Sequence, residues 1–165
     1  MSVLRLALGV LVVLLAAVLL WEVLAPAPER KEVSEFTTSQ QCIACHADAG
    51  AEWSDSWHAR AWIDPDVRAL SNDFANTDCI DCHAPRPVFE TGLGQRVLPR
   101  SARRQEGVDC IACHALPASL GGGVAGTLDD PSAPCRPRAT IDLARVEFCA
   151  PCHDQHQTVQ QWRAS

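Results

Sequence analysis

The sequence predicts a mainly α-helical protein with extensive irregular loops and one additional helix at its amino end. Three observations support this fold class. The chain has 165 residues, enough for one small domain and an appendage. Its helical patterns are short, and 11 Pro and 9 Gly residues interrupt them. Its four Phe, five Trp and absent Tyr are too few to fill a core, so something other than aromatic side chains must fill it.

An apolar segment opens the chain. Residues 6–21 carry no charge and would span about 24 Å as a helix, while residues 3–24 would span about 33 Å. We expect residues 1–25 to form a transmembrane anchor rather than a cleaved signal peptide, because Pro28 follows the candidate cleavage site Ala25-Pro26-Ala27. In either case the rest of the chain is exported to the periplasmic or extracellular face of the cytoplasmic membrane, or is secreted if the helix is cleaved.

Residues 26–35 (PAPERKEVSE) lack apolar periodicity, which predicts a linker, and residues 36–165 then form a single domain. Apolar spacing predicts helices within this domain, and Gly and Pro residues predict one long loop, with little or no sheet. The expected helices cover residues 49–62, 140–149 and 155–163, and the expected loop covers residues 116–138.

Four copies of a C-x-x-C-H motif dominate the domain. They are Cys42-Ile-Ala-Cys45-His46, Cys79-Ile-Asp-Cys82-His83, Cys110-Ile-Ala-Cys113-His114 and Cys149-Ala-Pro-Cys152-His153. This spacing is the attachment signature of a c-type haem. In a helical turn, residues i, i+3 and i+4 share one face, so two thiols can add to the vinyl groups of a porphyrin while the imidazole reaches the iron. The sequence therefore predicts four covalently attached c-type haems, with short helices wrapped around them.

Two other uses of the cysteines compete with this interpretation. Paired C-x-x-C units can bind structural zinc, and an exported Cys-rich chain can form disulfides. Neither explains why a histidine follows the second cysteine in all four units. The net charge of −6, from 20 acidic and 14 basic residues, argues against nucleic acid as a partner.

The segment after the first motif carries a family resemblance. Trp53, Ser56, His58 and Ala59 resemble the W-x-x-S-x-H-A segment of multihaem cytochromes related to the tetrahaem electron acceptor of hydroxylamine oxidoreductase. The resemblance extends from about residue 41 to the carboxyl end. It implies that His58 is a distal haem ligand.

The histidine count limits the coordination of the four haems. Four of the six histidines belong to the motifs, which leaves His58 and His156 as spare imidazoles. At most two haems can therefore have two histidine ligands from this chain, and the others are five-coordinate, water-ligated or ligated by another chain. Cys135 is the ninth cysteine, a candidate thiolate ligand or simply an unpaired thiol.

These observations predict an electron-transfer protein that passes electrons through closely spaced haems and exchanges them with redox partner proteins. The alternatives are a membrane-anchored quinol dehydrogenase and a redox enzyme that uses an open-coordination haem. Four arginines, Arg96, Arg100, Arg103 and Arg104, suit haem propionates or belong to a solvated loop. Residues 161–165 (QWRAS) resemble the start of a second W-x-x-S-x-H-A segment, so we expect either a truncated form of a longer cytochrome or a partner chain that supplies the missing ligand.

Overall fold

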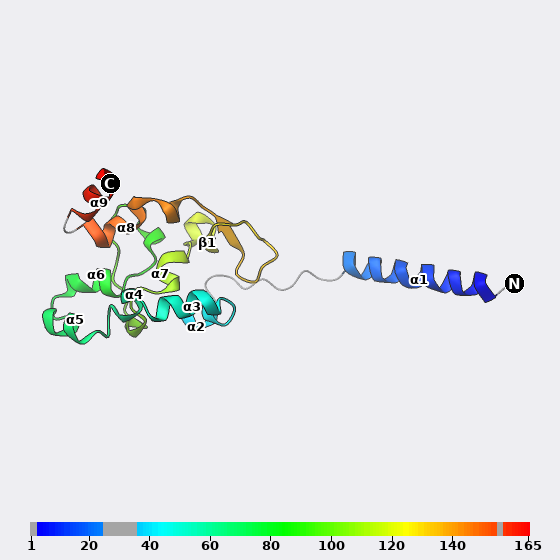
Figure 1. The fold of residues 1–165 in the computed structure, drawn as a ribbon, viewed down its shortest axis with the longest axis horizontal. Coiled ribbons are helices and arrows are strands. Elements are labelled where there is room, and N and C mark those ends of the chain that lie inside the picture. Colours follow the sequence, from blue (N-terminus) through cyan, green and yellow to red (C-terminus); the bar gives the residue numbers. More distant parts are fainter. Residues whose placement is uncertain (1–2, 25–35, 155–156) are drawn as a thin grey trace.

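The computed structural model describes residues 3–24, 36–154 and 157–165. The described elements are mainly helical and short, and irregular loops join them (Figure 1). The helices are α1 (Val3–Leu24), α2 (Ser39–Ile43), α3 (Ala47–Ser54), α4 (Trp57–Arg60), α5 (Pro65–Leu70), α6 (Ile80–His83), α7 (Cys110–His114), α8 (Val146–His153) and α9 (Thr158–Ala164). Single 3₁₀ turns are η2 (Thr77–Cys79), η3 (Val88–Glu90), η4 (Arg104–Glu106), η5 (Ala118–Leu120) and η6 (Asp142–Ala144).

The apolar amino-terminal segment forms α1, as the sequence predicts. Within the part of the chain that the structure describes, no helix has the length and apolar character needed to cross a membrane. The expected transmembrane helix is therefore not supported.

The helix expected over residues 49–62 divides into α3 and α4. Ser56 has an extended backbone and caps α4, because its Oγ accepts a 3.3 Å hydrogen bond from the amide of Ala59. The helix expected over residues 140–149 begins only at Val146, after an extended Arg145 and the turn η6. The helix expected over residues 155–163 corresponds to α9.

The expected loop over residues 116–138 contains one small sheet. Strands β1 (Val124–Gly126) and β2 (Pro137–Ala139) pair in parallel, with Ala125 opposite Arg138. Little or no sheet was expected from the sequence pattern, because three-residue strands are too short to show alternation. Its buried residue, Ala125, accepts a hydrogen bond from His114 and so connects the sheet to α7.

Two small apolar clusters form the core, and both include motif cysteines. The first cluster packs Phe89 and Phe148 at a ring separation of 5.3 Å, with Cys113 and Cys152 against them. The second cluster contains Phe74, Ile80 and Ala84, with Trp62, Val67 and Cys79 against them. The second, third and fourth motifs are therefore anchored directly on the core.

Candidate functional site

Each C-x-x-C-H motif lies on a helical turn, as the attachment chemistry requires. The third motif coincides with α7, and the fourth occupies the carboxyl half of α8. The second follows η2 into α6. In the first, the amide of His46 donates a 2.9 Å hydrogen bond to the carbonyl of Cys42, which closes the turn after α2. The two thiols and the imidazole of a motif thus come from one turn of helix.

Two motif histidines have a fixed orientation and tautomer. His83 Nδ1 lies 2.7 Å from the carbonyl oxygen of Ala61, and His114 Nδ1 lies 2.8 Å from that of Ala125. A carbonyl oxygen only accepts, so Nδ1 carries the proton in both rings. Nε2 then keeps its lone pair for a metal, which is how ligating histidines are commonly held.

Thiols from the first and third motifs lie against each other. Cys42 donates a hydrogen bond to Cys110, which raises the pKa of Cys42 and lowers the pKa of Cys110 to about 7. Helices α2 and α7 pack together, and the side chain of Glu106 accepts a 3.0 Å hydrogen bond from the amide of Ser39. The turn before α7 therefore also holds the start of the first motif.

The fourth motif lies between the third and the second motifs. Cys152 donates a hydrogen bond to Cys82, which raises the pKa of Cys152 and lowers that of Cys82. Burial, together with the nearby Asp109 and Cys149, raises the pKa of Cys113 to about 12. Cys113 and Cys152 pack against the same apolar cluster. Helices α6 and α8 pack together (Figure 1). The motifs therefore form a spatial series in the order first, third, fourth, second.

His58 faces the histidine of the fourth motif. The ring centroids of His58 and His153 are 5.9 Å apart, with planes inclined at 59°. Burial, followed by the proximity of His153, lowers the pKa of His58, so the neutral imidazole is favoured. His156, the other spare histidine, lies outside the described residues.

The backbone of His58 is held by the segment that leads into α7. The carbonyl of His58 accepts a 2.9 Å hydrogen bond from Val108, whose own carbonyl accepts a 2.8 Å bond from the indole of Trp53. Gly107 lies close to the backbone of His58 and has a φ of +60°, and a Cβ atom at this position would lie 2.3 Å from the carbonyl oxygen of His58. These contacts explain why Trp53 accompanies His58 in the sequence.

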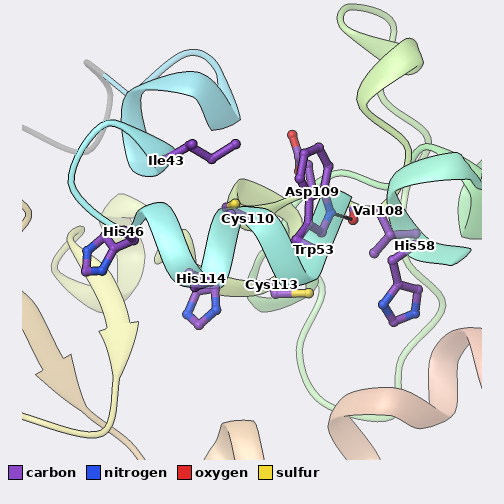
Figure 2. A pocket seen from close by; sticks show the side chains of 11 residues that line it. Ile43, His46, Trp53, His58, Val108, Asp109, Cys110, Cys113 and His114 are labelled. Atoms are coloured by element: carbon purple, nitrogen blue, oxygen red, sulfur yellow. Dashed lines mark hydrogen bonds between the residues drawn. The ribbon is translucent and has the colours of Figure 1, made fainter. Parts of the chain in front are cut away.

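An open cavity of about 170 Å³ lies in front of the third motif. Cys110, Cys113 and His114 line it together with His46 and His58. Figure 2 shows the side chains of Cys113, His114 and His58 on the same side of α3. All three attachment groups of this motif therefore open into one space, and its apolar lining has the chemistry that a porphyrin face requires.

A buried ion-pair network precedes α7. The carboxylate of Asp109 caps α7 through a 2.8 Å bond from Ala112 and lies 3.0 Å from Arg100 and 2.7 Å from Arg103. Burial lowers the pKa of Arg100, although Asp109 opposes that effect. Arg100 also donates to the carbonyl oxygen of Gly107, at 2.6 Å.

The four arginines that were expected to suit haem propionates contact groups of the protein itself in the structure. Arg96 pairs with Asp78 and Asp81, at 2.8 and 2.5 Å, and Arg100 and Arg103 pair inside the network around Asp109. The fourth arginine, Arg104, lies over the ring of Trp62. Protein carboxylates thus engage three of these four guanidinium groups.

The comparison with protein families was informative for part of the chain. Residues 41–115 match the family model of cytochrome c554 and c-prime. The match supports a multihaem c-type cytochrome family, for which covalently bound haem and electron transfer are expected. It covers the first three motifs and His58. Neither the curated proteins nor the solved structures gave a match.

Three functional features escaped sequence reasoning. The spatial order of the motifs has no local signal, because it depends on contacts between distant segments. The ion pairs could have been suspected from the opposite charges of Arg103 and of Glu106 and Asp109 at intervals of three residues, but the burial of the network could not. The position of Phe74 beside His83 depends on an unusual turn that composition does not indicate.

Proposed function

We propose that the protein is an electron-transfer protein with four c-type haems, one on each motif. The observation that carries this proposal is the series of motifs in the order first, third, fourth, second: α2 packs against α7, Cys113 and Cys152 pack against one apolar cluster, and α6 packs against α8. When bound, haem iron supplies a one-electron couple. The protein fixes the spacing of the motifs, and the two ends of the series, at the first and second motifs, are where redox partner proteins would exchange electrons.

His58 and His153 are proposed as the two axial ligands of the haem on the fourth motif. Metal–imidazole bonds are about 2 Å long, so two imidazoles on opposite sides of one metal ion have centroids roughly 6 Å apart. The observed separation of 5.9 Å fits this arrangement. The low pKa of His58 keeps the imidazole neutral, which is the form that binds a metal.

We propose that the domain acts on the exported side of the cytoplasmic membrane, because an apolar amino-terminal segment precedes it. The relation to the electron acceptor of hydroxylamine oxidoreductase is also a proposal. It rests on the segment from Trp53 to Ala59 and on the matched range of residues 41–115.

The haem content tests the proposal directly. A pyridine haemochrome assay should give four haems per chain, none of them extractable by acidic solvent. Fewer than four, or extractable haem, would overturn the assignment of the motifs.

The coordination of His58 is tested by electron paramagnetic resonance on the full chain. His58→Ala should convert one low-spin haem to high spin while four haems stay attached. Trp57→Ala is the matched control, because Trp57 is the preceding residue and is largely exposed. An unchanged spectrum in His58→Ala would remove His58 from the ligand set. Turnover of a small substrate by the unaltered protein would favour instead a redox enzyme with open coordination.

A further inference from the structure

A stack of side chains lies against the histidine of the second motif. The rings of Trp62 and Phe74 are nearly parallel, at 5°, with centroids 3.9 Å apart. The ring of Phe74 meets the imidazole of His83 at 5.7 Å, inclined at 59°. Phe74 is buried and belongs to the same apolar cluster as Cys79, the first thiol of this motif. The stack therefore touches both the thiol and the imidazole ends of the motif.

The backbone adopts an unusual conformation to place Phe74. Asn72, Asp73 and Phe74 have φ values of +49°, +57° and +59°. This left-handed region is unfavourable for non-glycine residues, and most so for bulky ones. The amide of Phe74 donates a 3.0 Å hydrogen bond to Ser71 Oγ, and Asp73 forms an ion pair with Arg68. Backbone strain that the surroundings maintain often marks a functional position.

Two guanidinium groups flank the stack. Arg68 lies 5.8 Å from the rings of both Trp62 and Phe74, and Arg104 lies 5.3 Å from the ring of Trp62. The ion pair with Asp73 compensates the charge of Arg68. Arg104 has no carboxylate partner among the ion pairs of the described residues, and its Nε donates a 2.8 Å bond to the carbonyl of Arg100. Its charge therefore acts on the stack without local compensation.

We propose that Phe74 is a positioning residue for the axial ligand His83 and that Arg104 raises the reduction potential of the haem on the second motif. This inference rests on the proposed function. The hydrogen bond to Ala61 fixes one edge of the imidazole, and the ring of Phe74 limits its rotation about that bond. A nearby positive charge stabilises the reduced form of a haem, which carries one electron more than the oxidised form.

The separations within the stack set the size of the charge effect. Taken end to end, they place Arg104 at most about 15 Å from His83. At that distance and an effective dielectric constant of about 20, removal of one charge changes a reduction equilibrium roughly sixfold. For a one-electron couple this is about 50 mV, because a tenfold change corresponds to 59 mV.

Redox titration of the complete haem-loaded protein tests the role of Arg104. Arg104→Gln should lower the potential of the haem on the second motif by about 50 mV and those of the other haems according to their distances from Arg104. A His83→Met variant, with a different axial ligand, identifies which component belongs to the second motif. Arg138→Gln is the matched control, because Arg138 lies on β2, where it donates a hydrogen bond to the carbonyl of Leu120, on the side of the domain opposite α5 and α6 (Figure 1). An unchanged potential in Arg104→Gln, or an equal shift in Arg138→Gln, would overturn the assignment.

Substitutions of Phe74 separate the ring from the backbone. Phe74→Gly accepts a positive φ without strain but lacks the ring. Phe74→Tyr keeps the ring. Electron paramagnetic resonance of the second haem should change its g values in Phe74→Gly and keep them in Phe74→Tyr, with four haems attached in both. Unchanged g values in Phe74→Gly would overturn the positioning role. A second motif without haem in the unaltered protein would instead contradict the proposed function.

Discussion

The ion pair between Arg100 and Asp109 is a sensitive point of the fold, and Arg100→Met tests it. The side chain of Arg100 is 7% exposed and that of Asp109 is fully buried. Besides Asp109, the guanidinium group binds three backbone carbonyls, at 3.3 Å from Pro85, 2.8 Å from Arg103 and 2.6 Å from Gly107. Methionine has a similar length but carries neither the charge nor the donors.

The expected cost of Arg100→Met follows from the charge balance of the network. Arg100 and Arg103 balance Asp109 and Glu106, so removal of Arg100 leaves one negative charge in excess. Loss of one partner from a buried ion pair costs about 3–5 kcal/mol. Because domains of this size are stable by about 5–15 kcal/mol, the variant should lose a large part of its free energy of unfolding.

Equilibrium unfolding in guanidinium chloride, followed by circular dichroism of the haem-loaded protein, measures this loss. The control is Arg86→Met, which removes a half-exposed pair with Glu90 and should cost about 1 kcal/mol or less. Adding Asp109→Asn to Arg100→Met restores the charge balance, so the double variant should lose less than the sum of the single losses. A cost for Arg100→Met no larger than for Arg86→Met would refute the reasoning.

Three further predictions concern neighbouring contacts. Gly107→Ala should destabilise the protein by more than about 1 kcal/mol and perturb the haem that we propose His58 binds, because the added methyl group would collide with the carbonyl oxygen of His58; a spectrum and melting temperature like those of the unaltered protein would contradict this. Trp53→Phe should cost about 1 kcal/mol through loss of the 2.8 Å indole hydrogen bond, measured by chemical unfolding, and an unchanged midpoint would speak against it. A backbone hydrogen bond and, secondly, the Arg163 guanidinium lower the pKa of Glu147 in the folded protein. The ionised carboxylate therefore stabilises the folded protein above the unfolded pKa of about 4.5, and this stabilisation disappears as the pH falls through the lower folded pKa. Amide exchange in α9, corrected for intrinsic rates, should therefore accelerate on acidification in the unaltered protein but not in Glu147→Gln.

The sequence was most informative where a motif determines its own geometry. The C-x-x-C-H spacing predicted helical turns, and all four motifs lie on such turns. The spacing of Trp53 and His58 singled out a histidine that the fold holds beside His153. Helix boundaries were less predictable, because Ser56 can continue a helix or cap a new one, and only the tertiary contacts of Val108 with His58 decide between these.

Contacts between segments that are far apart in the chain could not be predicted from the sequence. Nothing near Cys110 indicates that its neighbour is Cys42, since the contact depends on Glu106 reaching Ser39. The left-handed turn before Phe74 contains no glycine, so the usual signal for positive φ is missing. Both features come from the packing of segments that are far apart in the chain.

The spatial order of the motifs has a consequence for how the protein is made. The first motif packs against the third, and the second against the fourth, so the two pairs are interleaved along the chain. The hydrogen bond from Ser39 to Glu106 already joins residues 67 positions apart. During synthesis from the amino end, the first motif cannot pack until the third has been made. The second cannot pack until the fourth, which lies near the carboxyl end of the domain, has been made. If haem is attached to each motif before its partner motif is available, the attachment acts on a chain that is still unfolded, and the slow, non-local contacts form last.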